Sequence, residues 1–369
     1  MNAKPSYETV GVPFLAAAAV LLLAISGLHA GCTGSSPPAG APGASGGGGP
    51  TPGAPIISGP HAHANLAVYL VHGSDRLGGR TPITLDAALR AKKVIVHEAE
   101  DVGRLAIENV SDDEVFVQAG DLVKGGRQDR TVGVDVVVPP KSGKVDVAAF
   151  CVEQRRWAQR GAEPPRHFSE SSRCLAGKEL KLAARQRKQQ GQVWAAVAET
   201  QRKLHEKTGN GALDASSPSS MQLTMETSAV RAGIRPYLEA LARVTGGESD
   251  VVGCAFAING NLSSAELYAS PALFRAQWPK LLEAGAVEAL AEAQVVPGTP
   301  PAIDAVRAFL EDPPAGRRSE EEVGGRTKLT TVDGAQAVVF ETRDLGRGET
   351  WIRRSVVGKE PGSTGGGGS

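Results

Sequence analysis

The sequence predicts an α+β fold with an antiparallel, β-rich N-terminal half. Between residues 65 and 152, short valine-rich runs alternate with turn residues, as in antiparallel strands. From 177 to 207, apolar residues recur every three or four positions, as in a long helix packed on a sheet. After residue 297, strand-like runs return and predict a small β appendage at the C-terminus. We therefore expect a central β-hairpin, a long helix, further helices packed on the sheet, and this appendage.

The first residues have the form of a secretory signal. An apolar run extends from about Val12 to Leu28, which is shorter than the roughly 20 residues of a membrane-spanning helix. The whole signal-like segment ends in Ala30-Gly31-Cys32, which resembles the end of a bacterial lipobox, although His29 stands where leucine is usual. We expect lipidation of Cys32, with an uncleaved anchor or simple secretion as alternatives. All three place the rest of the chain outside the cytoplasm, and the first two hold it at a membrane of the bacterial cell envelope.

The composition suggests five segments. Residues 1–32 are the signal and lipobox-like segment, and residues 33–57 are a disordered Gly/Pro/Ser/Ala tether. Residues 58–298 are the main α+β domain, residues 299–360 the appendage, and residues 361–369 a disordered Gly/Ser tail.

Charge and cysteine content exclude several classes of protein. The chain has 40 Lys and Arg against 40 Asp and Glu, so bulk charge indicates no nucleic-acid partner. Beyond Cys32, three cysteines permit one disulfide or none: Cys151, Cys174 and Cys254. No zinc spacing occurs, and the sequence sets neither a cofactor nor the oligomeric state.

The elements of the N-terminal half follow in order. A short helix is expected over Leu85–Ala91, with Thr84 as its N-cap. Strands are expected at 67–71, 93–97, 105–108 and 115–118. The central hairpin is expected over Arg130–Cys151, around a turn at 139–142.

The hairpin register follows from its apolar pattern. If Val138 faces Gly143, one face is wholly apolar, with the pairs Val136–Val145, Val134–Val147 and Val132–Ala149. The same register sets Asp135 against Asp146, which is unfavourable unless both carboxylates face water. At the open end it places Arg130 opposite Cys151 and Gln128 opposite Glu153.

Beyond the long helix, further elements are expected. A helix at 235–244 precedes a hairpin of strands 251–258 and 262–268, turned by Asn259-Gly260. Helices are expected at 271–283, 287–293 and 302–311, then a charged linker. Strands are expected at 328–332, 335–342 and 350–357.

Two polar segments at strand ends predict a site where the hairpin opens. One is Gly120-Asp121-Leu122-Val123-Lys124-Gly125-Gly126-Arg127-Gln128-Asp129-Arg130, and the other is Cys151-Val152-Glu153-Gln154-Arg155-Arg156-Trp157. Guanidinium groups and glycine-rich backbone can hold an anion there. The candidate ligand-binding residues are Gly120, Asp121, Lys124, Gln128, Arg130, Arg156 and Trp157.

Other roles for these segments stay open. In an enzyme, Glu153 would be the general acid or base and Cys151 the nucleophile, with His167 as the nearest base for the thiol. In a structural protein, an Arg130–Glu153 pair would fix the strand ends and Cys151 would be an inert apolar residue. Binding is favoured because no complete catalytic arrangement can be assembled.

These two segments resemble the ARG and rhodanese-phosphatase-superfamily-associated protein domain. That family's pattern has a Gly-Asp/Glu start, a Gln-Asn-Arg element and Cys-Val-Glu-x-x-Arg-Trp; residues 274–282 resemble its C-terminal helix. The likeness covers roughly residues 63–296. Asp129 stands where the family usually has Asn, and Arg155 where it often has Gly. The family's association with ADP-ribosylglycohydrolases and phosphatases implies phosphorylated or ADP-ribose-like ligands.

Two other possibilities have weaker support. His61 and His63, with His72 or His97, could approach a metal, but histidines beside a tether are more often plain surface residues. No Gly-x-Ser-x-Gly occurs, so the sequence gives no support to a serine hydrolase.

Overall fold

A computed structural model describes residues 55–161, 163, 167–209, 211–311 and 316–359. These residues belong to one compact unit. The expected signal, Cys32, most of the tether and the C-terminal tail lie outside the described residues, as does the side chain of Cys174.

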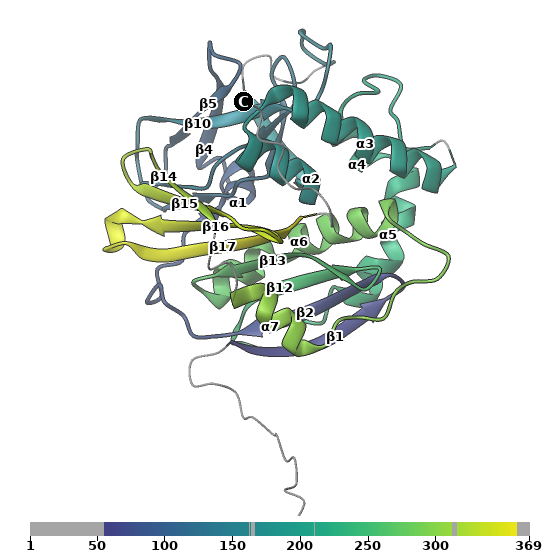
Figure 1. Cartoon of the computed structure of the whole chain (residues 1–369). Helices are drawn as coiled ribbons and strands as arrows, with labels where there is room; N and C mark the ends of the chain where they lie inside the picture. Colours follow the sequence, from purple (N-terminus) through teal and green to yellow (C-terminus); the bar gives the residue numbers. More distant parts are fainter. Residues whose placement is uncertain (1–54, 162, 164–166, 210, 312–315, 360–369) are drawn as a thin grey trace, which may run out of the picture. The chain divides into compact units, whose positions relative to one another are not determined.

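The largest sheet has eight antiparallel strands and joins the two ends of the described chain (Figure 1). Its strand order is β1-β2-β12-β13-β17-β16-β15-β14. The strands are β1 (Ile56–His63), β2 (Leu66–His72), β12 (Val251–Ile258), β13 (Asn261–Tyr268), β14 (Arg317–Val323), β15 (Thr327–Asp333), β16 (Ala337–Asp344) and β17 (Thr350–Gly358). Ile56 and Ile57, expected in the tether, already belong to β1.

Two smaller sheets hold the motif segments. A six-stranded sheet has the order β11-β7-β8-β10-β5-β4, and a three-stranded sheet has the order β3-β6-β9. The strands are β3 (Ile83–Thr84), β4 (Val94–Glu98), β5 (Arg104–Asn109), β6 (Val115–Val117), β7 (Asp121–Gly125), β8 (Arg130–Val132), β9 (Val136–Val138), β10 (Lys144–Cys151) and β11 (Phe168–Leu175).

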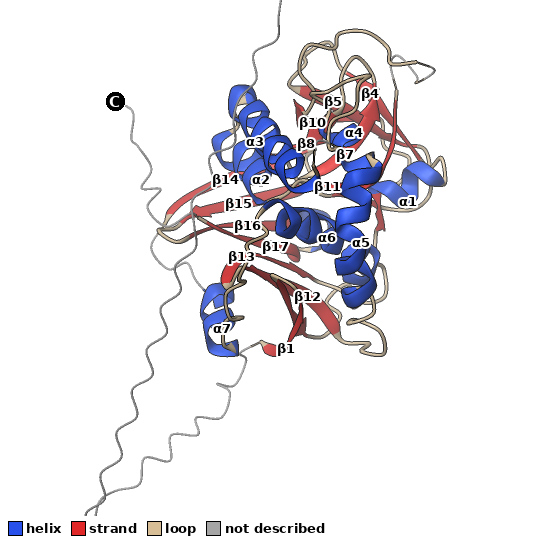
Figure 2. Cartoon of the chain, turned by 90° about the vertical axis from the view of Figure 1, so that its right-hand side faces the viewer, coloured by secondary structure: helices blue, strands red, loops and turns tan. Residues whose placement is uncertain are grey.

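Helices cover both faces of the large sheet (Figure 2). Alternate residues of β2 and β12, such as Leu70 and Phe256, pack against α5 and α6, whereas Tyr69 and Ala255 face α7. This alternation is the two-residue period of a sheet buried on both sides. The helices are α1 (Leu85–Arg90), α2 (Lys178–Lys181), α3 (Gln190–Thr208), α4 (Met221–Glu226), α5 (Ser228–Leu241), α6 (Pro271–Ala291) and α7 (Ile303–Glu311), with a π-helix η1 (Leu182–Arg187) and a 3₁₀ turn η2 (Leu345–Arg347).

The α+β class is confirmed, and so are several local predictions. Thr84 caps α1 by accepting a hydrogen bond from the N–H of Ala87. The Asn259-Gly260 turn joins β12 to β13, and both residues have positive φ, at 50° and 79°. That left-handed geometry is the one that favours an Asn-Gly pair in a two-residue hairpin.

The C-terminal strands form, but not as a separate appendage. β17 pairs with β13 and so extends the large sheet, and the segment expected as a charged linker contains its edge strand β14. The pairing brings Arg353 beside Glu266, and both side chains are fully buried. This ion pair between two strands attaches the C-terminal segment to the large sheet. The local sequence does not predict it.

The expected long helix is interrupted. α2 passes into the π-helix η1, and Lys188 then adopts a left-handed conformation with a φ of 51° before α3 begins. The two helices expected at 271–283 and 287–293 instead form the single helix α6, which contains Pro279.

The central hairpin is correct only at its open end. The pairs Val132–Ala149 and Arg130–Cys151 are present between β8 and β10. The other predicted pairs are wrong, because β10 changes partner at Ala148 and continues along β5, while β9 pairs with β6. Asp135 therefore does not face Asp146. It is buried beside Arg353 and Arg185, so the predicted clash between like charges is removed.

Candidate functional site

The two motif segments adjoin on the six-stranded sheet. β7 pairs with β8, and β8 pairs with the last residues of β10. Within the described chain their side chains divide into three polar networks.

The first network centres on Arg130, which is fully buried. Its Nη1 donates to the Cys151 thiol at 2.7 Å and to the Gln128 amide oxygen at 3.3 Å, and its Nη2 lies 3.4 Å from a Glu98 carboxylate oxygen. Burial raises the pKa of the Cys151 thiol, although the Arg130 guanidinium opposes this. The thiol is thus favoured over the nucleophilic thiolate. His167, the predicted base for the thiol, lies instead against His97, with ring centroids 5.3 Å apart.

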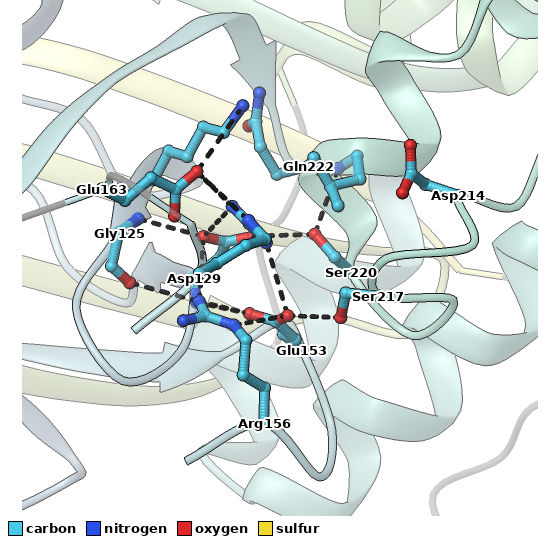
Figure 3. Close-up of polar contacts among 12 residues, drawn as sticks. Gly125, Asp129, Glu153, Arg156, Glu163, Asp214, Ser217, Ser220 and Gln222 are labelled. Atoms are coloured by element: carbon cyan, nitrogen blue, oxygen red, sulfur yellow. Dashed lines mark hydrogen bonds and ion pairs between the residues drawn. The ribbon is translucent and has the colours of Figure 1, made fainter. Parts of the chain in front are cut away.

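The second network joins two buried carboxylates through two arginines (Figure 3). Arg156 lies 2.6 Å from one oxygen of Glu153 and 3.5 Å from Asp129. Arg160 donates to both oxygens of Asp129 at 3.0 Å and lies 3.4 Å from Glu153. Each arginine therefore bridges the same two carboxylates.

Hydroxyls and backbone groups complete this second network. Ser217 donates to Glu153 and Ser220 to Asp129. The N–H of Asp129 also donates to Glu153, so the predicted Gln128–Glu153 pairing is replaced by a contact one residue away. Burial alone would raise the pKa of Glu153, but these hydrogen bonds and those of Arg156 outweigh it and lower the pKa. Glu153 is therefore a stabilised carboxylate at neutral pH and is poorly suited to act as a general acid.

The third network holds the start of the motif. Asp121 is fully buried and contacts Lys280 of α6, which lies 3.2 Å from Asp86. Burial raises the pKa of Asp121, against the effect of Lys280. Gly120, at a φ of 96°, bonds through its backbone to Val132 and Ala176. These two motif residues anchor β7 to the helical layer and are separate from the Arg130 network.

A basic and aromatic surface lies beside these buried networks. We call Arg127, Arg155 and Trp157 the motif surface; all three are exposed, Trp157 by 55% and the side chain of Arg127 by 61%. The two loops that carry it are joined, because Arg156 donates to the Gly126 carbonyl at 3.0 Å. A Cβ on Gly126 would lie 2.6 Å from the Phe168 ring, so only glycine fits where the first loop turns.

Arg155 occupies a strained position on this surface. Its φ is 75°, in the left-handed region that side chains other than glycine rarely adopt. The chain turns tightly here although the sequence offers no glycine. Such strain is most often found at functional sites, where the surroundings hold it.

The remaining candidates lie elsewhere. His61 and His63 are on the edge strand β1, and His63 packs edge-to-face on Tyr237. No group of three or more His, Cys, Asp or Glu side chains among the described residues is placed to hold a metal ion. Cys151 and Cys254 are both free thiols.

A separate groove of about 1460 Å³ lies among α3, α6, α7 and the β12–β13 turn. Its floor is largely apolar, with Met221, Ala284 and Phe309 among its lining residues. None of its lining residues comes from either motif segment.

The comparison with known families supports the motif assignment. The sequence matches the ARG and Rhodanese-Phosphatase-superfamily-associated Protein domain over residues 56–357. The chain belongs to this family. The match extends past residue 296 to the C-terminal strands, in agreement with their place in the large sheet. No curated protein matches the chain. No solved structure matches it either.

Membership clarifies the two departures from the family pattern. Arg155, where the resemblance predicts glycine, has a positive φ of 75°, a geometry that favours glycine. Asp129 stands where the resemblance predicts Asn, and its carboxylate accepts hydrogen bonds from Arg160 and Ser220. Arg160 and the two serines were not among the predicted site residues, since none of them lies in either motif.

No helix in the described part of the chain has the length and apolar character to cross a membrane.

Proposed function

We propose that this ARG and Rhodanese-Phosphatase-superfamily-associated Protein domain is an exported, membrane-tethered receptor that binds an anionic, phosphorylated or ADP-ribose-like ligand at the motif surface. The observation that carries the proposal is that the strained, exposed Arg155 and the exposed ring of Trp157 share one loop, which Arg156 joins to the loop of a second exposed guanidinium, Arg127. Guanidinium groups pair with phosphate oxygens in a bidentate manner, and an indole face offers a stacking surface for a base.

The buried networks support binding rather than catalysis. Arg130, Glu153 and Cys151 have little or no exposed surface, and apart from the buried Nε of Arg130 their polar atoms bond to one another or to near neighbours. A ligand that reached them would have to break these contacts. They act instead as a rigid frame for the loops above them, as a recognition site requires. A hydrolase that uses Glu153 and Cys151 receives less support for the same reason.

Ligand binding can be tested by titration of the purified domain, from residue 55 onward, with ADP-ribose, a sugar phosphate and inorganic pyrophosphate. Calorimetry is the readout for every variant, and the ligand-induced change in tryptophan fluorescence, which Trp157→Ala should abolish, is the second readout. We expect saturable binding that weakens about tenfold or more in Arg127→Ala and in Trp157→Ala, as loss of a charge-assisted bond or a stacking face would cause.

The matched control is Arg235→Ala, which removes an arginine whose side chain is 70% exposed on α5. Its affinity should equal that of the wild type. Absence of binding to all three probes, or equal loss in the control, would refute the motif surface as the site.

The membrane tether is a separate part of the proposal. Cys32 in its lipobox-like context supports lipidation, and the Gly/Pro/Ser-rich segment after it supports a spacer between membrane and domain. Mass spectrometry of the mature N-terminus should find a lipid-modified Cys32, and Cys32→Ser should release the protein from membranes. An unmodified N-terminus at Gly31 or Cys32 would remove the anchor.

A further inference from the structure

The β1–β2 hairpin and a loop 178 positions further along the chain meet at one end of the large sheet, away from the motif segments. The Ser58 hydroxyl lies 2.8 Å from Nε2 of His72. Nδ1 of the same ring lies 3.2 Å from a carboxylate oxygen of Asp250. A hydroxyl on one ring nitrogen and a carboxylate on the other is the geometry that activates a serine nucleophile.

We propose that Ser58, His72 and Asp250 form an acyl-transfer site that acts on solvent-exposed esters. Ser58 Oγ attacks the ester carbonyl carbon while its proton passes to Nε2 of His72. The C–O bond to the leaving alcohol then breaks, and the alcohol takes the proton from Nε2. Water repeats the sequence on the acylated serine, so one ester and one water give one acid and one alcohol.

The sheet register builds this arrangement. Ser58 of β1 pairs with Leu70 of β2, so His72 is its diagonal neighbour on the same face. Asp250 immediately precedes β12, and its carbonyl accepts a hydrogen bond from the N–H of Gly73 at 2.8 Å. This bond holds the acidic loop against the end of β2. A register shift follows Ser58 along β1, and such bulges often lie beside active sites, where they re-aim a side chain.

The charges around His72 suit a base that becomes positive. The carboxylate of Asp250 favours the tautomer with hydrogen on Nδ1, which leaves Nε2 free to accept the serine proton. A Glu248 oxygen lies 3.7 Å from Nε2 and would stabilise the imidazolium ion that forms. Glu248 and Asp250 are 43% and 61% exposed, so solvent screens both effects, whereas His72 is only 12% exposed.

The position on an edge strand supplies hydrogen-bond donors and access. β1 is the edge strand of the sheet as the structure describes it, so the N–H groups on its outer side are unpaired within this sheet and are the proposed donors to a developing oxyanion. Ser58 is half-buried, and no residue of the triad lines the large groove. The site therefore fits a short or surface-borne acyl group and not a long chain that needs an enclosed tunnel.

The proposal can be tested with a fluorophosphonate probe and p-nitrophenyl acetate on the domain from residue 55 onward. We expect covalent modification on the Ser58 peptide by mass spectrometry and a burst of p-nitrophenol equal to the protein concentration. His72→Asn should slow both reactions roughly 100-fold or more while the melting temperature stays near that of the wild type. Asp250→Asn should slow them less, with unchanged probe affinity.

The matched control is Ser249→Ala, which removes an exposed hydroxyl from the same loop. It should leave modification of Ser58 unchanged. Modification spread over several surface serines, or Ser58 labelling that is the same in His72→Asn, would overturn the proposal. Loss of ligand binding at the motif surface would not affect this result, because the two sites share no residue.

Discussion

Two networks of buried ion pairs differ in depth and in charge balance. In the core network, between the large sheet and η1, Asp135 and Glu266 meet three cations: Arg353, Lys181 and Arg185. In the motif network, Asp129 and Glu153 meet two arginines that keep 11–12% of their side chains exposed. The first network carries an excess positive charge away from water, whereas the second, in which Arg160 also contacts Glu163, has no excess of cations and touches solvent.

The core network attaches strands, whereas the motif network positions loops. Arg353 makes 2.7 Å contacts to both carboxylates of the core network and so ties the C-terminal strands to the rest of the sheet. Burial lowers the pKa of Arg185 to about 10, the cost of a third cation in this network. The guanidinium offsets part of that cost by stacking 4.1 Å above the Phe340 ring. The motif network fixes loops whose outer residues remain exposed, as a ligand site needs.

The largest expected effect is the loss of Arg353. Arg353→Met leaves Asp135 and Glu266 buried without their shared partner, which should lower the free energy of unfolding by about 3–5 kcal/mol. Urea denaturation followed by circular dichroism measures it. The neighbouring Arg354→Met is the control and should change stability by about 0.5 kcal/mol or less. A loss for Arg353→Met no larger than for the control would show that the core network contributes little.

A smaller loss is expected in the motif network. Arg156→Met should lower the free energy of unfolding by only about 1–3 kcal/mol, because Arg160 still reaches both carboxylates and solvent can enter. The same denaturation experiment applies. A cost equal to that of Arg353→Met would contradict the difference in depth between the networks.

The pH dependence of stability should show how much the Glu153 carboxylate contributes to it. Its pKa is lowered from the ordinary value of 4.5, so its stabilising contribution is present above that pH and is lost as pH falls through the folded-state pKa. The stability difference between wild type and Glu153→Gln should therefore shrink between neutral pH and about pH 3. Glu239→Gln, on exposed α5 surface, is the comparison variant. A difference that stays constant over this range would mean that Glu153 is not held as a carboxylate by its neighbours.

The smallest effect concerns backbone strain at the motif surface. Arg155→Gly should raise stability by about 0.5–1 kcal/mol, since glycine adopts a φ of 75° without steric cost. Arg155→Ala keeps the strain and should leave stability nearly unchanged. Both variants should weaken binding of the anionic probes. If the glycine variant were less stable than the alanine variant, the strain argument would be wrong.

Local sequence signals predict many elements correctly. The Thr84 cap, the Asn259-Gly260 turn and the apolar pairing of Val132 with Ala149 all depend on residues close in the chain or on a two-residue period. The hairpin register likewise placed Arg130 opposite Cys151. In these cases the information needed lies within a short segment.

The remaining features depend on contacts between residues far apart in the sequence. Asp135 meets Arg353 across 218 positions, and Asp129 meets Ser220 across 91. The Ser58–His72–Asp250 cluster is not marked by a local motif such as Gly-x-Ser-x-Gly, so the sequence did not predict it.

The sequence by itself therefore determined the α+β class, the motif residues and the expected form of the N-terminus. Only the tertiary structure decided which strands share a sheet, which charges are buried and which arginines remain on the surface. The physical reason is that burying a charge is favourable only when a partner reaches it, and the partners here are brought together by strand pairing over long separations.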